Sequence, residues 1–386
     1  MEININKLPA RTFNWLGMNE TTVEVPEFIS GVMKESLPCE VTCERKSFDE
    51  SLDEVHSNKS AGSADADDNF FSAVYETGMG KDFDSLIARS KAESYVLKTK
   101  PGIAASEAVR FKIKTGGENS VNSLIVNAAK DSSVTIVMDY ASSEGVSKEN
   151  NPEAECSHNM FGVQTRVEAD TGSSVCLVQI LRHGADTSCL NDIGAVLKDG
   201  ASLNVIQLVL DGNRNYMGSR VVLEGDGSAF TSDIGYIVEN GGRLDMNYSA
   251  LHMGRNTESA INAAGVLKDR AFKLFRGTID FSKGAAGSVG NEKEDVLLLD
   301  DNVVNQTIPL ILCAEEDVEG NHGATIGELG DELLLYMQSR GMSREQVYEE
   351  MSRARINAVC GKIPDAATRE FMAEYLELRG SKRNGG

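Results

Sequence analysis

A cysteine and a histidine near the end of the strand-rich part of the chain have the residue types and spacing of a metal site. Cys313 and His322 lie nine residues apart, and the segment between them carries four acids at positions 315, 316, 317 and 319. Thiolate, imidazole and carboxylate groups are the side chains that bind iron and iron–sulfur clusters. The spacing suits a structural turn equally well, so the pattern predicts either metal ligands at Cys313 and His322 or an ordinary turn.

The other cysteine and histidine pairs carry weaker signals. Cys39 and Cys43 form a Cys-x-x-x-Cys spacing without a nearby histidine, which favours two unpaired thiols. Cys156 and His158 lie in a polar stretch and are interpreted as loop residues rather than ligands of a soft metal. The remaining candidates are predicted to be structural, namely Cys176, Cys189, His183 and His252.

Common catalytic motifs are missing from the sequence. Gly80-Lys81 is followed by Asp82, where a phosphate-binding loop needs Ser or Thr. Neither a Gly-x-Ser-x-Gly nucleophile elbow nor a His-Glu-x-x-His zinc helix occurs. We therefore expect a chain that hydrolyses no ATP itself.

Composition excludes several classes of protein. The 386 residues include 38 Lys and Arg against 59 Asp and Glu, a net charge of −21, so nucleic-acid phosphates would be repelled. The first residues offer neither the charge nor the apolar run of a signal peptide, and no later segment is apolar enough for a membrane helix. Seven scattered cysteines indicate reduced thiols. We expect a cytoplasmic protein without nucleic-acid or membrane partners.

The strand-rich part of the chain is repetitive. Short runs of alternating Val, Ile and Leu follow small Asp/Gly/Ser turns, and their first apolar residues lie 41, 28, 27, 14 and 28 residues apart, close to multiples of 14. Such a period predicts a parallel β-helix with one strand and turn per half-coil. An antiparallel sandwich or barrel with coincidental spacing is the alternative. The marker residues are Val134, Val175, Leu203, Phe230, Leu244 and Phe272.

Helical periodicity replaces the strand pattern after His322. One helix is predicted around Leu329 and Met337 and is ended by Gly341, a second begins with a Ser343/Gln346 capping box, and a third contains Phe371 and Leu378. Residues 46–70 are poor in apolar residues and are predicted to be a linker. The predicted organisation is an N-terminal segment with a flexible linker (1–70), a parallel β-helix core (71–325), a helical domain (326–379) and a disordered tail (380–386).

The segment around His322 resembles the SufB/SufD family, the scaffold proteins of the SUF iron–sulfur cluster assembly system. The similarity rests on His322-Gly323-Ala324-Thr325, on Leu334-Leu335-Tyr336 and on Ser339-Arg340-Gly341, and it covers about residues 75–378. Gly323 resembles SufD, because SufB proteins have Glu after this histidine. Glu294 stands near the position of a cluster-building cysteine of SufB, Gly320 replaces a cysteine common in SufD, and Cys313 matches one common in SufB.

The resemblance implies a fold and a function. It implies a right-handed parallel β-helix with a C-terminal helical domain, and a non-catalytic scaffold that pairs through its core with a SufB-like subunit or with itself. The helices would hold the ABC-type ATPase SufC, whose ATP-driven dimerisation deforms the core interface. The resemblance also implies a transient iron–sulfur cluster shared at that interface, with His322 as one of its ligands. The residues expected to contact SufC are Leu329, Leu333, Tyr336, Met337, Val347 and Met351.

Two other functions remain open from the sequence. One is a β-helix carbohydrate-active enzyme of the secreted type, with the acids between Asp186 and Asp233 lining a groove. The other is a purely structural partner of a SufB-like protein, in which His322 binds no cluster.

Overall fold

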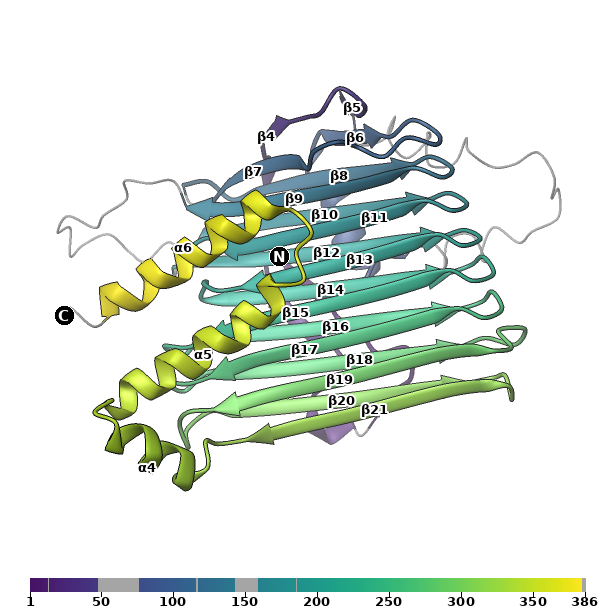
Figure 1. Cartoon of the computed structure of the whole chain (residues 1–386). Coiled ribbons are helices and arrows are strands. Elements are labelled where there is room, and N and C mark those ends of the chain that lie inside the picture. The colour runs from purple at the N-terminus through teal and green to yellow at the C-terminus, as the bar shows by residue number, and fades with distance from the viewer. Residues whose placement is uncertain (13, 48–75, 116, 143–158, 185, 384–386) are drawn as a thin grey trace.

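The computed structural model describes residues 1–12, 14–47, 76–115, 117–142, 159–184 and 186–383, with side chains as far as residue 379. Figure 1 shows long strands stacked one above another, with helices from the C-terminal part of the chain crossing the face nearer the viewer. Most of the predicted linker, residues 48–70, lies outside the described residues. No helix within the described ranges combines the length and apolar composition needed to cross a bilayer.

Successive strands alternate between two sheets, and each pairs in parallel with the strands two positions before and after it. The first sheet contains β6 (Ser94–Lys98), β8 (Ser120–Ala128), β10 (Asn159–Ala169), β12 (Thr187–Leu197), β14 (Arg214–Leu223), β16 (Arg243–His252), β18 (Phe272–Phe281) and β20 (Val304–Cys313). The second contains β7 (Val109–Thr115), β9 (Ser133–Ser142), β11 (Ser174–Arg182), β13 (Ser202–Val209), β15 (Ala229–Val238), β17 (Glu258–Leu267), β19 (Ser288–Leu298) and β21 (Val318–Gly327). This pairing confirms the parallel β-helix and excludes the antiparallel alternative.

The register of the strands explains the repeat. Val175 pairs with Val134 and with Leu203, and Leu203 pairs with Phe230, so these markers form one column in the second sheet. In the first sheet the pattern slips by one residue, because Leu244 pairs with Lys273 instead of Phe272. Lys273 therefore takes the inward position that the sequence pattern assigns to an apolar residue.

Inward-facing side chains of both sheets form one continuous apolar column. A chain of buried hydrogen bonds interrupts it midway: Tyr140 donates to Asn191 (3.0 Å), and Asn191 and Gln207 both donate to the Gln179 side-chain oxygen (2.7 Å each). Tyr248 donates to Gln207. These buried polar groups therefore bond to one another, as a stable interior requires.

The two ends of the β-helix differ. At the N-terminal end, β4 (Met33–Ser36) pairs antiparallel with β7, and β5 (Thr42–Lys46) pairs antiparallel with β6. The two-residue strand β3 (Ile29–Ser30) pairs with β8. At the other end, β20 and β21 are the last strands of their sheets (Figure 1). The two sheets therefore end in short antiparallel strands on one side and in two ten-residue strands on the other, which we call the open end.

Helices cover the outer face of the second sheet. α5 (Arg344–Cys360) and α6 (Ala366–Arg383) bury Ile356, Val359 and Met372 against Ile206 and Leu208. The predicted capping box of Ser343 and Gln346 begins α5. α4 (Asp331–Ser339) precedes it and ends before Gly341, whose φ of +95° confirms the expected left-handed position. α6 continues through residue 383, further than the sequence pattern indicates, and residues 384–386 lie outside the described residues.

The N-terminal segment covers the outer face of the first sheet. It comprises the antiparallel pair β1 (Glu2–Ile5) and β2 (Thr21–Glu24), the short helix η1 (Asn14–Leu16) and, after the undescribed stretch, α3 (Lys81–Arg89). Asp245 anchors this segment by accepting hydrogen bonds from Arg276 (2.6 Å), Thr21 (2.7 Å) and Asn6 (2.9 Å). Both outer faces of the central coils are therefore covered.

Candidate functional site

The open edge of β20 has free hydrogen-bond donors at alternate residues. The N–H of Val304 donates to Ala271, and the N–H of Ala314 donates to Phe281, so the even-numbered residues of this strand bond back to β18. The odd-numbered residues face the open edge. Pro309 is one of them, so its missing N–H costs no bond to β18.

The edge of β21 also has N–H groups at alternate residues that face the open edge, but on this strand they belong to the even-numbered residues. The N–H of Val289 donates to Thr257 in the preceding coil, and Val289 aligns with Glu319, so odd-numbered residues of β21 bond back to β19. The N–H groups of Gly320, His322 and Ala324 point to the open edge. Neither β20 nor β21 contains Lys or Arg, the residues that commonly protect an exposed edge.

His322 lies on β21 with its side chain on the interior side. It pairs in register with Glu292 of β19, and Glu292 is only 5% exposed because it points into the β-helix. Paired residues on neighbouring parallel strands point to the same face about 4.8 Å apart. His322 is exposed because no coil follows it. It therefore forms part of the outermost interior layer, directly above Glu292.

The Glu292 carboxyl group occupies space that a glycine provides. A Cβ atom at Gly277, on the opposite sheet, would lie 2.4 Å from the Glu292 carboxyl carbon. The Glu292 Oε2 atom is buried and has no hydrogen-bond partner among the described residues. Burial, and secondarily the charge of Glu294, raise the pKa of Glu292 to about 7, partly offset by Lys273. A buried carboxyl oxygen without a partner is costly and calls for a ligand or a proton.

Lys273 and Glu294 form a buried ion pair beside Glu292. The Lys273 ammonium donates to Glu294 and to the Thr307 hydroxyl (3.1 Å), and Thr307 donates to the other Glu294 oxygen (2.7 Å). Burial lowers the pKa of Lys273, and Glu294 opposes that shift. Both Glu294 oxygens are thus occupied by partners on β18 and β20.

Cys313 lies away from His322 along the open end. Gly320 faces Ile311 across the interior, since a Cβ at Gly320 would lie 3.1 Å from the Ile311 side chain. The strands run in opposite directions, so His322 faces Pro309, and Cys313 lies four residues or about 13 Å further along. The Cys313 thiol donates to the Glu315 carbonyl (3.0 Å). The structure therefore does not bring Cys313 and His322 together, and the described residues contain no group of three His, Cys, Asp or Glu suited to a metal ion.

Three of the four acids between these residues, at positions 315–317, belong to a turn, and Glu319 lies on β21. The Glu315 carboxylate accepts hydrogen bonds from the N–H groups of Gly284 and Glu316 (2.9 Å each), which lower its pKa. The Asp317 carbonyl accepts from the Gly287 N–H (2.6 Å). The turn thereby bonds to the preceding coil, which fits the structural-turn interpretation of this stretch.

The other sequence candidates occupy separate positions. Cys39 is exposed and Cys43 is half-buried on β5, where burial raises the Cys43 pKa to about 12. Burial raises the Cys176 pKa to about 11 and lowers the pKa of His183 to about 3 and of His252 to about 4. Such groups stay uncharged near neutral pH, as structural side chains do. Cys156 and His158 lie outside the described residues.

The candidate SufC-contacting residues are exposed to different degrees. Leu333 and Tyr336 on α4 are exposed, and so is Leu335, which the sequence analysis did not select. Leu329, Met337 and Met351 are half-buried. Val347 is fully buried, so it packs within the folded chain and presents no surface. The exposed apolar surface is therefore concentrated on α4.

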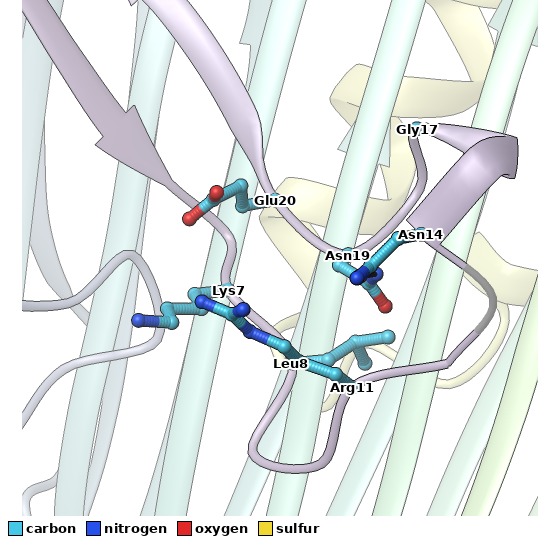
Figure 2. Close-up of a pocket in the computed structure, with 7 residues that line it drawn as sticks. All are labelled: Lys7, Leu8, Arg11, Asn14, Gly17, Asn19 and Glu20. Carbon is cyan, nitrogen blue, oxygen red and sulfur yellow. Dashed lines mark hydrogen bonds between the residues drawn. The ribbon is translucent and has the colours of Figure 1, made fainter.

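A pocket of about 330 Å³ lies in the N-terminal segment, between the loop after β1 and the segment around η1 (Figure 2). Lys7 and Arg11 line it beside Asn14 and Asn19. The amides bond locally: Asn19 donates to Asn14 (2.9 Å) and accepts from the Thr12 N–H (2.8 Å). The pocket lies within one segment and shares no residue with the open end.

Sequence reasoning missed Lys273, Gly277 and Glu292 as parts of the site. The available signal was the alternation of β19, in which Glu292 and Glu294 share their parity with Val296, a residue of the interior core. Charged residues at inward positions of two successive half-coils indicate a polar interior layer.

Comparisons with known proteins identify the family of the chain. The family profile described as SUF system FeS cluster assembly, SufBD core domain, matches residues 111–354. The iron–sulfur cluster assembly protein SufD of Bacillus subtilis is 25% identical over 263 residues, 67% of this chain and 57% of that protein. SufB of the same organism is 25% identical over 143 residues, 37% of this chain and 31% of that protein.

A chloroplastic SufBD family protein of Arabidopsis thaliana is 28% identical over 165 residues, 43% of this chain and 29% of that protein. The chain thus spans between 29% and 57% of the length of these relatives. Since the profile match covers more than half of the chain and the fold is a parallel β-helix followed by helices, the chain belongs to the SufBD core family of the SUF iron–sulfur cluster assembly system.

Proposed function

We propose that the chain is a non-catalytic, cytoplasmic scaffold subunit for iron–sulfur cluster assembly, and that it pairs through its open end with a SufB-like subunit or with a second copy. The observation that carries this proposal is the contrast between the two ends of the β-helix. The last strands at the N-terminal end are β4 and β5, which are only four and five residues long, whereas β20 and β21 expose two ten-residue edges. Long edges without Lys are prone to pair with other strands, so a partner strand is their natural cover.

A second surface suits an ATPase of the SufC type. α4 buries none of its own residues and exposes Leu333, Leu335 and Tyr336. α4 contacts α5, which packs on β13, β15 and β17. A force applied at α4 would therefore pass through α5 to the second sheet. This path supports the proposal that ATP-driven SufC dimerisation deforms the pairing surface.

The cluster is cargo in this proposal, assembled where the open end meets its partner. His322 is the side chain of this end best suited to bind iron or sulfur species, since its imidazole is exposed in the outermost layer. A purely structural partner would not need this histidine. Cluster yield in the assembled complex, compared between wild type and His322→Ala, separates the two roles.

Two of the acids considered for a carbohydrate-active enzyme, Asp192 and Asp233, are buried. Asp192 is fully buried and accepts the Met79 N–H (2.9 Å) beneath the segment that leads to α3. Asp233 is 4% exposed and bonds to Asn262 (2.9 Å) and to Lys362 (2.5 Å). These contacts give the two carboxylates structural roles and favour the scaffold function.

The pairing claim is tested by the molar mass of the chain mixed with the SufB-like protein of its own source, measured by light scattering after gel filtration. Ala324→Pro removes an edge-facing N–H without removing a bond to β19, so it should prevent pairing and leave the fold intact. Ala324→Ser keeps that N–H and is the control. Pairing that survives Ala324→Pro, with normal folding, would contradict the use of this edge.

Docking of the ATPase is tested separately by co-purification. Leu333→Glu combined with Tyr336→Glu should abolish retention of the SufC-type ATPase, because both side chains leave an exposed apolar surface. Gln338→Glu adds a charge to the same helix at a polar position and should retain the ATPase. Equal retention by both variants would remove α4 from the proposal.

A further inference from the structure

We propose that the loop around η1 is a second contact for the SufB-like subunit that pairs through the open end, with Trp15 packing against that subunit. The η1 loop comprises residues 7–12 and 14–20 and joins β1 to β2 on the outer face of the first sheet. The inference deepens the proposed function and rests on it for the identity of the partner. The contact itself rests on the position of the loop and on its exposed apolar side chains.

The first argument is where the loop is attached. Arg276 on β18 donates to the Met18 carbonyl (2.6 Å) and to the Thr21 hydroxyl (2.9 Å). Asn6, on the other side of the loop, donates to Asp245 on β16 (2.9 Å). Both ends of the η1 loop are therefore fixed to the strands that precede β20 in the first sheet.

The direction of the N-terminal segment leads to the same place. β3 follows β2 and pairs with β8 through Ile29 and Ser120. In the first sheet, β10, β12, β14 and β16 separate β8 from β18. The segment therefore crosses the outer face from β8 to β18, and the η1 loop lies at its β18 end, beside β20. In Figure 1 the purple ribbon of this segment passes behind the strands and reaches the level of β20 and β21.

The second argument is exposure. Trp15 is 81% exposed and its neighbour Leu16 is 40% exposed. Single exposed apolar residues are common on protein surfaces, so exposure alone would not mark a contact. Tryptophan, however, is enriched among the few residues that supply most of the energy of an interface. Trp15 is the only tryptophan of the chain, and it lies beside the edge that the proposed function assigns to a partner.

The apolar surface continues from the loop onto β20. Arg276 pairs in register with Ile308, so both side chains point to the outer face of the sheet about 4.8 Å apart. Leu310 and Leu312 share this face by alternation, and all three aliphatic residues are half-buried. Val304 at the start of the strand is 44% exposed. A subunit paired to the edge of β20 would therefore extend an apolar face that the η1 loop flanks.

Hydrogen bonds hold the η1 loop in one conformation. Asn19 accepts from the N–H and the hydroxyl of Thr12 (2.8 Å each) and donates to Asn14 (2.9 Å). The Gly17 N–H donates to the Asn14 carbonyl (3.1 Å), and its φ of +64° is a left-handed value that glycine adopts readily. Figure 2 shows these three residues of the loop, Asn14, Gly17 and Asn19. Trp15 is thus presented by an ordered loop, which lowers the entropy lost on binding.

The test uses the single tryptophan as a probe. The full chain is labelled with fluorotryptophan, so that fluorine NMR shows one resonance, and is mixed with the unlabelled SufB-like subunit of its own source. We expect the resonance to move when the complex forms. Its isotope shift between light and heavy water should fall by more than half, because the partner excludes solvent from the indole ring.

A truncation measures how much the contact contributes. Trp15→Ala should weaken pairing by about tenfold or more in light scattering. Because Trp15 is exposed, this variant should fold as the wild type does. Val32→Ala shortens another exposed apolar side chain, between β3 and β4 and 68% exposed, and is the control. It should change the affinity by less than about twofold.

The outcomes separate this contact from the proposed function. A complex in which the fluorine resonance keeps its position and its isotope shift, or in which Trp15→Ala pairs as the wild type does, overturns the η1 contact alone. A folded wild type that forms no complex overturns the proposed function and the contact with it. Because each chain carries a net charge of −21, a second copy is the less favourable occupant. A resonance that moves with chain concentration alone would contradict that choice of partner.

Discussion

Lys273 and Glu294 face each other inside the β-helix, where neither side chain reaches solvent. Taking both charges out of water is expensive, and their attraction with the Thr307 hydrogen bonds offsets that cost. At the residue scale, the polar layer below the open end therefore depends on every member having its partner.

Lys273→Met should destabilise the chain by about 3–5 kcal/mol, because it leaves Glu294 buried without a cation. The double variant Lys273→Met with Glu294→Gln should regain more than half of that loss, since it removes the unpaired charge. Urea unfolding monitored by circular dichroism measures both. Equal stabilities of the single and double variants would show that leaving Glu294 without Lys273 does not destabilise the chain.

Asp192 should make the free energy of unfolding depend on pH, and a single substitution can isolate this effect. Burial, followed by the charge of Asp84, raises the pKa of Asp192 to about 7, although the Met79 N–H and Gln164 oppose the shift. Between about pH 4 and 7 the folded chain then holds a proton that the unfolded chain has lost. The stability from this group is complete below that window and is lost as the pH rises through 7.

Asp192→Asn should therefore gain stability over the wild type by about 2–3 kcal/mol on going from pH 5 to pH 8. Unfolding free energies of both proteins at several pH values give this difference directly, because titrating groups that do not interact with Asp192 contribute equally to both. A difference that does not change with pH would mean that Asp192 is ionised throughout.

At the scale of elements, the helices could be predicted because short sequence motifs mark where they begin and end. Ser343 and Gln346 form the capping box of α5, and Gly341 supplies the left-handed residue that separates it from α4. The packing of the helices was harder to predict, because α5 buries Val347 and Ile356 in the protein while α4 exposes Leu333, Leu335 and Tyr336. An apolar stripe alone does not say which face finds a partner within the chain.

Ile356→Ala should cost about 2–4 kcal/mol and loosen α5 from the second sheet, because Ile356 is fully buried beside Ile206 and Leu208. Limited proteolysis should then cut within residues 340–365 faster than in the wild type. Asn357→Ala, at an exposed position of the same helix, is the control. Unchanged proteolysis in Ile356→Ala would mean that α5 is held by other contacts.

At the scale of the whole molecule, the β-helix was predictable because its coils repeat the same alternation near 14 residues. The one-residue change of register that pairs Leu244 with Lys273 was not predictable. A shift of one residue moves a side chain to the other face of the strand, and the interior at this point is polar. The open end was also hidden, because β20 reads like the buried strands before it. Exposure there follows from the absence of a further coil in the described chain, which no local pattern encodes.

On the proposed function, the open edges of β20 and β21 are the surface through which this chain pairs. Amide hydrogen exchange, measured by mass spectrometry with and without the SufB-like subunit, tests it most directly. We predict that the edge-facing N–H groups within residues 304–327 exchange quickly in the isolated chain and become protected in the complex, while β4 and β5 change little. A stable complex in which these edges still exchange quickly, and protection appears elsewhere, would contradict it.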